Sequence, residues 1–156
     1  MPIYDIDTID RVILNILQKD GRIANVDLAE RAGLSPSPCA RRVKNLEDSG
    51  IIARSAALID QKAVGLPVNV FVNVTLERQV KDALQNFEAA ILKRPEVMEC
   101  YLMTGEADYF LRVVVADLDA YERFLVEHLT RIPGIANIKS SFALKQIAYR
   151  TELPIR

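Results

Sequence analysis

The stretch NVDLAERAGLSPSPCARRVKNLEDSG, Asn25 to Gly50, decides how the first third of this chain folds. It predicts two short helices joined by a tight turn. Asn25 can cap a helix over residues 26–32, because its side chain can accept a hydrogen bond from the first free N–H groups. Gly33 can end that helix in the left-handed conformation that glycine adopts readily.

The second helix of this pair carries an apolar stripe and a polar face. Ser35 can cap it, with Pro36 at its first position, where the missing N–H does no harm. Cys39, Val43 and Leu46 recur at i, i+4 and i+7 and predict one face packed inward. The opposite face suits the DNA major groove. The residues expected to contact DNA are Ser35, Ser37, Pro38, Arg41, Arg42, Lys44 and Asn45.

The polar face has a distinct chemistry for DNA. Arg41 points most directly away from the apolar stripe, so we expect its planar guanidinium to contact a base edge or the backbone. Arg42 lies at the margin and is expected to meet phosphate. Ser35, Ser37 and the amides at the start of the helix can hold a phosphate. The alternative for three cations alone is a solvated charged face.

The composition is that of an ordinary globular protein. Of 156 residues, 50% are hydrophobic and 26% are charged, and the net charge is -1. Residues 1–54 hold eight basic and eight acidic side chains, so the expected DNA-binding part is neutral. We therefore expect weak non-specific binding and a need for several copies of the module. No apolar run is long enough for a membrane span, and MPIYDIDTID does not resemble a signal peptide, so a cytoplasmic protein is expected.

Metal, disulfide and catalytic chemistry have no support in the sequence. Cys39 and Cys100 fall in different predicted elements and are expected to be reduced and buried. No cluster has metal-ligand spacing, and no nucleophile has an evident base. We therefore expect no cofactor, no metal site and no catalytic residue.

Helical and extended segments flank the opening stretch. Asp7 is expected to cap a first helix over residues 8–18, which shares a small core with the other two. Residues 51–59 read as an extended segment, either a wing or a connecting strand. Residues 60–67 predict a short helical turn closed by glycine and proline. The domain boundary is expected between residues 54 and 67.

The rest of the chain alternates strands and helices. The first expected elements are a strand over 68–76 and a helix over 82–93, which buries Leu84, Phe87, Ile91 and Leu92. Two strands over 97–103 and 109–116, joined by a turn, follow. A helix over 118–131 and a strand over 135–149 complete the series. This βαββαβ order predicts an α+β, ferredoxin-like sheet with both helices on one face. The other face of the sheet must then be covered, and packing against a second copy of the chain is the simplest way to cover it.

With these elements in place, the chain resembles the Lrp/AsnC family of transcription regulators along nearly its whole length. The matching stretches are ILNILQKDGRIANVDLAERAGLSPSPCARRVKNLEDSGII, the GEADY turn and the terminal SSFALKQIAYRTELP. The ending of the last stretch looks more like the leucine-responsive and cysteine-responsive members than the asparagine type. The resemblance implies a winged helix-turn-helix over residues 1–53, a linker over 54–67 and an amino-acid-sensing RAM domain, a dimeric α+β barrel, over 68–156. It also implies double-stranded DNA as partner, and dimers that assemble into octamers, as tetramers of dimers.

The resemblance further implies an effector, leucine or another small amino acid, bound between dimers. Gly105 leaves its N–H free for a carboxylate, and Asp108 or a carbonyl of the turn can take the ammonium. Ala107 stands where many members carry tyrosine. The alternative is a plain hairpin turn. The residues expected at the effector site are Leu102, Met103, Thr104, Gly105, Glu106 and Asp108, with Ile132, Pro133 and Gly134 of a neighbouring copy, and Ser140 and Ser141.

Two rival functions share this scaffold. Sirohaem decarboxylases resemble the family and have lost DNA binding, but they need histidine and arginine around a large tetrapyrrole pocket. This chain has one histidine, His128, and an intact basic helix, which weighs against that enzyme. The other rival is an architectural protein that compacts DNA with little sequence reading. We therefore expect a regulator that is not an enzyme.

Overall fold

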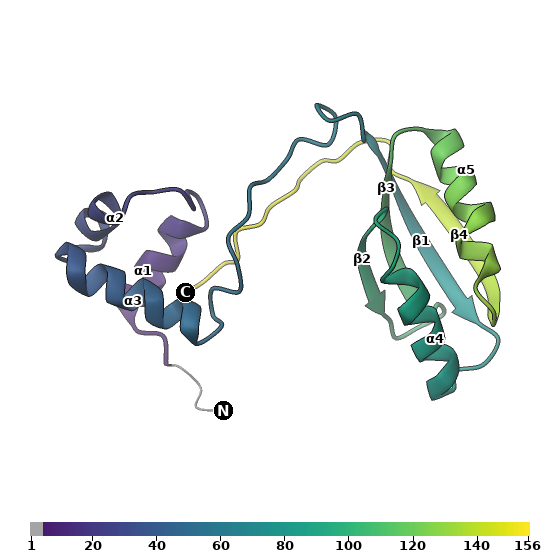
Figure 1. Ribbon diagram of the computed structural model, residues 1–156, viewed down its shortest axis with the longest axis horizontal. Helices are drawn as coiled ribbons and strands as arrows, with labels where there is room; N and C mark the ends of the chain where they lie inside the picture. The colour runs from purple at the N-terminus through teal and green to yellow at the C-terminus, as the bar shows by residue number, and fades with distance from the viewer. Residues whose placement is uncertain (1–4) are drawn as a thin grey trace. The chain divides into compact units, whose positions relative to one another are not determined.

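The computed structural model describes residues 5–156, which form two compact units (Figure 1). The helical unit holds the residues up to Leu58 together with Ile147–Arg156, and the sheet unit holds Ile59–Gln146. The sequence did not predict that the C-terminal segment packs with the helical unit. Residues 1–4, part of the acidic segment on which the expected cytoplasmic location rests, lie outside the described residues. No helix within residues 5–156 could cross a membrane.

The helical unit begins with α1 (Thr8–Leu17), followed by α2 (Asn25–Ala32) and α3 (Pro36–Asp48). Asp7 caps α1, as predicted, and takes part in a reciprocal capping box. Its carboxylate accepts the N–H of Asp10 at 2.8 Å, and the Asp10 carboxylate accepts the N–H of Asp7 at 3.4 Å. This arrangement satisfies N–H groups that the helix itself leaves without partners.

The turn between α2 and α3 is tight, as predicted. Gly33 ends α2 with φ 71° and ψ 33°, the left-handed conformation. Ser35 is the N-cap of α3, although its hydroxyl makes no capping bond. The prediction that Asn25 caps α2 is wrong, because Ala24 occupies that position. The Asn25 side chain instead donates to the Pro36 carbonyl at 2.9 Å, which joins the starts of the two helices.

The helices share one small core and one ion-pair network. The buried side chains are Ile13, Leu14, Leu28, Ala29, Cys39 and Leu46. Outside this core, Nη1 of Arg42 on α3 lies 2.7 Å from Asp7 Oδ2 and 2.9 Å from Asp10 Oδ1. The Asp10 N–H, and after it the Arg42 guanidinium, holds the pKa of Asp7 below its usual value. Arg42 therefore fixes α3 against the start of α1.

The sheet unit has the predicted βαββαβ order. Its elements are β1 (Val68–Leu76), α4 (Lys81–Ile91), β2 (Val97–Leu102), β3 (Tyr109–Val115), α5 (Leu118–Glu127), the 3-10 turn η1 (Leu129–Arg131) and β4 (Ile135–Phe142). The strands lie in the order β2-β3-β1-β4 and pair antiparallel, with β2 and β4 at the edges (Figure 1). The ferredoxin-like prediction is confirmed.

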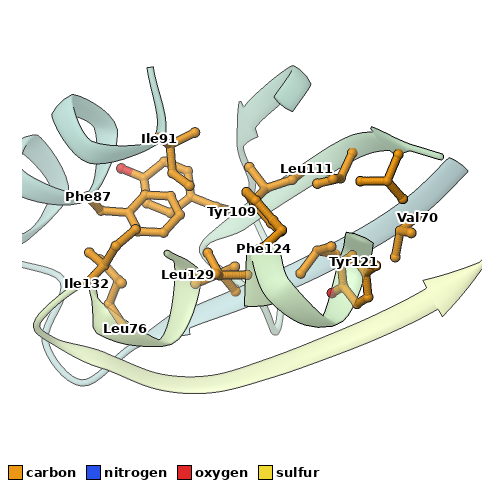
Figure 2. Close-up of a cluster of buried hydrophobic side chains, with 14 residues drawn as sticks. Val70, Leu76, Phe87, Ile91, Tyr109, Leu111, Tyr121, Phe124, Leu129 and Ile132 are labelled. Atoms are coloured by element: carbon orange, nitrogen blue, oxygen red, sulfur yellow. The ribbon is translucent and has the colours of Figure 1, made fainter. Parts of the chain in front are cut away.

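Both helices cover one face of the sheet, as predicted. Alternate residues of β1 point to this face and pack against Phe87 of α4 and Phe124 of α5 (Figure 2). The Phe87 and Tyr109 rings stack at 4.4 Å between centroids. On the opposite face Phe71 and Phe110 stack at 5.7 Å and are only half-buried. The sheet therefore has one packed face and one partly open face.

Several expected elements are shorter in the structure. β4 ends at Phe142 rather than near Tyr149, because Phe142 already pairs with Val70 near the start of β1. Residues 53–60 form neither a wing strand nor a connecting strand. The expected helix over residues 118–131 breaks at His128, whose φ of -123° is not helical.

Two side chains are more exposed than expected. α4 ends at Ile91, so Leu92 falls outside its buried face and is 82% exposed. Cys39 is buried in the helical core, as predicted, but Cys100 is exposed because it lies on the edge strand β2. Both thiols are free.

The ion pairs of Arg42 generate the first prediction. We expect Arg42→Met to lower the melting temperature of the full chain, because the cation between the two carboxylates is lost. Lys44→Met is the matched control, since it removes an exposed i,i+4 pair with Asp48, a kind of pair that contributes little.

The pH dependence follows from the lowered pKa of Asp7. A carboxylate with a depressed folded-state pKa stabilises the protein above its unfolded pKa of about 3.9. That contribution is lost as the pH falls through the folded value. The difference in unfolding free energy between wild type and Arg42→Met should therefore shrink from pH 7 to pH 3 in denaturant titrations. A constant difference would contradict the assignment.

Candidate DNA-binding and effector-binding sites

The outward face of α3 presents polar side chains over a rigidly packed base. Ser37, Arg41 and Lys44, spaced at i, i+4 and i+7, are all exposed, as is Asn45. On the opposite side Leu46 is fully buried. Because the helix is anchored by its inward face, the exposed groups are held in a fixed direction.

The three cations of α3 have different surroundings. Arg41 is exposed and has no ion-pair partner within the described chain. Lys44 donates to Asp48 at 2.8 Å, and this hydrogen bond raises the pKa of Lys44. Arg42 is half-buried and directed to the two carboxylates at the start of α1. Its expected contact with phosphate stays a prediction, and Arg41 is the cation most available to DNA.

The start of α3 offers fewer donors than an ordinary helix. Pro36 and Pro38 carry no N–H, so Ser37 alone supplies an amide within residues 36–38. Ser35 and Ser37 are exposed, whereas Pro38 is half-buried. A phosphate at this end would therefore depend on the two hydroxyls and one amide.

The expected effector turn, residues 104–107, is fastened to the end of β1 by Asp108. Asp108 is 5% exposed, and its Oδ2 accepts the N–H of Leu76 at 2.7 Å. Its Oδ1 accepts a hydrogen bond from Nε2 of Gln79 at 2.5 Å. The Asp108 backbone N–H donates a hydrogen bond to the Val74 carbonyl at 2.9 Å. Both carboxylate oxygens therefore already have protein partners, so a further role in holding an ammonium stays a prediction.

A second expected segment reaches the same end of β1. The Gly134 carbonyl accepts the N–H of Glu77 at 2.8 Å, directly after the strand. Gly105 and Gly134 have φ of 115° and 88°, which favours glycine at both positions. The chain's own residues 132–134 therefore flank the strand end that holds the turn. The expectation that the same segment of a neighbouring copy contributes to the effector site stays a prediction.

The two serines do not share a face. Ser140 pairs with Val72, and its hydroxyl contacts that of Tyr121 beneath α5. Ser141 pairs with Phe71 and faces the open side, because successive strand residues alternate. The two hydroxyls therefore lie on opposite faces of β4, and the expectation that both belong to the effector site stays a prediction.

Exposure separates the remaining expected residues. Leu102 and Met103 are 62% and 46% exposed, whereas Ile132 is part of the core. Ile132 and Pro133 also border a depression of about 320 Å³ between the ends of α4 and α5, which residues 104–108 do not line. Within the described chain, no group of three or more His, Cys, Asp or Glu side chains could hold a metal ion.

Sequence reasoning missed Gln79, which fixes Asp108. These residues lie 29 positions apart, and neither has a local pattern that signals the contact.

Comparison with known proteins finds two family models along the chain. Residues 6–53 match the model of a winged helix-turn-helix DNA-binding domain, and residues 69–153 match that of the Lrp/AsnC ligand-binding domain. The Bkd operon transcriptional regulator of Pseudomonas aeruginosa is 48% identical over 97% of this chain and 99% of its own length. The leucine-responsive regulatory protein of Salmonella typhimurium is 42% identical over 99% and 94%.

Solved structures similar to this chain are also transcription regulators. A transcriptional regulator from Neisseria meningitidis, crystallised as an L-methionine complex, has a TM-score of 0.92 and 43% identity over 96% of this chain and 97% of its own. An AsnC family regulator from Agrobacterium tumefaciens has a TM-score of 0.91 and 43% identity over 95% and 96%. This chain belongs to the Lrp/AsnC family of transcription regulators, with a winged helix-turn-helix that binds DNA and a ligand-binding domain.

Proposed function

We propose that this protein reads a specific DNA site with α3, and that a small amino acid bound near the 104–107 turn changes its assembly or its affinity for DNA. The main support for this proposal is that Arg41 is exposed on one side of α3, while the opposite side of the helix is buried in the core. The proposal places the protein in the cytoplasm and gives it no catalytic role.

The DNA side of the proposal rests on arginine geometry. Arg41 can form two parallel hydrogen bonds to guanine O6 and N7, with Lys44 and Asn45 beside it. Ser35 and Ser37 then hold phosphate oxygens and set the register, while Pro38 packs at the helix tip. Arg42 contributes to phosphate contact only if it leaves its carboxylates.

The effector side rests on the end of β1. A bound amino acid needs donors for its carboxylate, acceptors for its ammonium and an apolar wall. Free amides in the glycine turn can supply the donors, and Glu106, Asp108 and Thr104 can supply the acceptors. Leu102, Met103 and Pro133 are exposed and can offer apolar surface, whereas Ile132 would contribute only from the core beneath them. The names of the relatives point the same way, since one is called leucine-responsive and another was crystallised with L-methionine.

The proposed assembly begins at the open face of the sheet. Phe71 and Phe110 stack there while half-buried, beside the Arg112–Glu99 ion pair at 2.6 Å. A second copy laid on this face buries both rings. Four such dimers give the octamer that we propose, with the amino acid between dimers.

Arg41→Ala tests the DNA contact. We expect binding to the protein's own promoter fragment to weaken about tenfold or more, because a bidentate arginine contributes about 1–3 kcal/mol of discrimination. Gel-shift titration of the full chain measures this. Arg123→Ala, an exposed arginine on α5, is the control. Equal affinities for both variants would remove Arg41 from the interface.

A thermal-shift screen of the twenty amino acids tests the effector. An amino acid that binds only the folded state adds about 2.7 kcal/mol of stability at a hundredfold excess over Kd. Gly105→Ala should reduce the shift, because φ of 115° strains an L residue and displaces the turn. Gly65→Ala, with φ 77° in the linker, is the matched control for strain. No shift with any amino acid would contradict the proposal.

Phe71→Arg tests the dimer. A charge on the open face should halve the mass of the smallest assembly in light scattering, because burying an unpaired cation is unfavourable. Glu122→Arg on the exposed side of α5 should leave the mass unchanged. If Phe71→Arg keeps the wild-type mass while remaining folded, the interface lies elsewhere.

A further inference from the structure

The C-terminal segment makes specific contacts with α1 in the helical unit. The side-chain amide of Gln18 bonds to both backbone groups of Leu153, in the manner of a neighbouring strand. Oε1 of Gln18 accepts the Leu153 N–H at 2.6 Å, and Nε2 donates to the Leu153 carbonyl at 3.1 Å. Nδ2 of Asn15 donates to the Ile155 carbonyl at 3.4 Å. These residues lie 135 and 140 positions apart, so the contacts are tertiary.

The segment also joins the core that carries the recognition helix. Ile155 is half-buried and packs against the cluster that contains Cys39 and Leu46, the inward stripe of α3. Leu153, in contrast, is 69% exposed, so its backbone rather than its side chain is held. Pro154 limits Leu153 to extended backbone, which suits its pairing with the Gln18 amide.

α1 is therefore held at both ends. Arg42 fixes its start to α3, and the C-terminal segment lies on its last turns. The chain also passes between the two units twice, once after Leu58 and once before Ile147. Releasing the whole segment would remove its contacts from the last turns of α1, and the helical unit would then be connected to the sheet unit only through the chain after Leu58.

We infer that the C-terminal segment, residues 147–156, supports DNA binding by packing on α1 and the core beneath α3. Gln18 is the positioning residue that holds this segment in place. The inference goes beyond the proposed function and needs only that α3 binds DNA. Gln18 acts through α1 and the shared core. Its loss therefore weakens DNA binding without removing a phosphate contact.

The test uses the full chain in four forms, with a truncation in reserve. Gln18→Ala removes both bonds to Leu153, and Gln18→Glu keeps the acceptor for its N–H but loses the donor. Thr151→Ala is the control, because it alters an exposed residue of the same segment without changing charge. If Gln18→Ala does not fold, a chain that lacks residues 153–156 replaces it, because this truncation also removes the bonds between Gln18 and Leu153.

Hydrogen exchange shows whether Gln18 holds the segment. The Leu153 amide should be protected in wild type and Thr151→Ala, partly protected in Gln18→Glu, and fast in Gln18→Ala. A fast Leu153 amide in the wild type would overturn the inference.

Binding to the promoter fragment, titrated over a range of salt, shows whether the segment matters for DNA. Gln18→Ala should bind about tenfold more weakly, the factor that about 1.4 kcal/mol produces. Gln18→Glu should fall between it and wild type. The salt slope should stay unchanged, because a lost phosphate contact would reduce it by about 1.

Two outcomes would contradict this inference, and a third would contradict the proposed function on which it rests. Wild-type affinity in a variant whose segment exchanges freely would overturn it, as would a reduced salt slope, which would place Gln18 at the DNA. A wild-type chain that ignores its own promoter fragment contradicts the proposed function instead, and the exchange data then still decide whether Gln18 holds the segment.

Discussion

The direction in which α3 presents Arg41 depends on a neighbouring arginine. Arg42 bridges the carboxylates of Asp7 and Asp10, which also form the capping box of α1. Helix start and helix packing are thus fixed by the same two acids. A single guanidinium nitrogen, Nη1 of Arg42, reaches both carboxylates because it carries two N–H donors. Two adjacent arginines on one helix therefore divide the work: Arg42 fixes the helix, and Arg41 is left exposed for a partner.

The sheet unit uses a buried carboxylate in a comparable way. Asp108 accepts the Leu76 N–H and the Gln79 amide, so the end of β1 and the start of β3 are locked together. The glycine turn that precedes Asp108 is closed by the hydrogen bond from the Met103 N–H to the Asp108 carbonyl at 2.8 Å, and residues 104–106 are exposed. Gly134 reaches the same strand end through the N–H of Glu77, which brings two separate segments to one place.

Local sequence patterns predicted what local chemistry determines. The Asp7 cap, the Gly33 turn, the inward stripe of α3 and the alternation along β1 all follow from residues a few positions apart. Contacts over long separations could not be read in this way, as Gln18 with Leu153 and Asp108 with Gln79 show. The faces of Ser140 and Ser141 were knowable from strand alternation alone, since adjacent residues cannot point the same way. The end of β4 was not, because it depends on where β1 begins.

The charge distribution is the reason why we expect DNA binding to require more than one copy of this chain. The expected DNA-binding part carries equal numbers of acids and bases, so it exerts little long-range attraction on a duplex. The contact that we propose for the exposed Arg41 and its polar neighbours would be specific in geometry but weak in total. Linking several such modules multiplies their affinity without any new contact. A ligand that changes how copies associate can then change DNA binding strongly through a small difference in its affinity for the two assemblies.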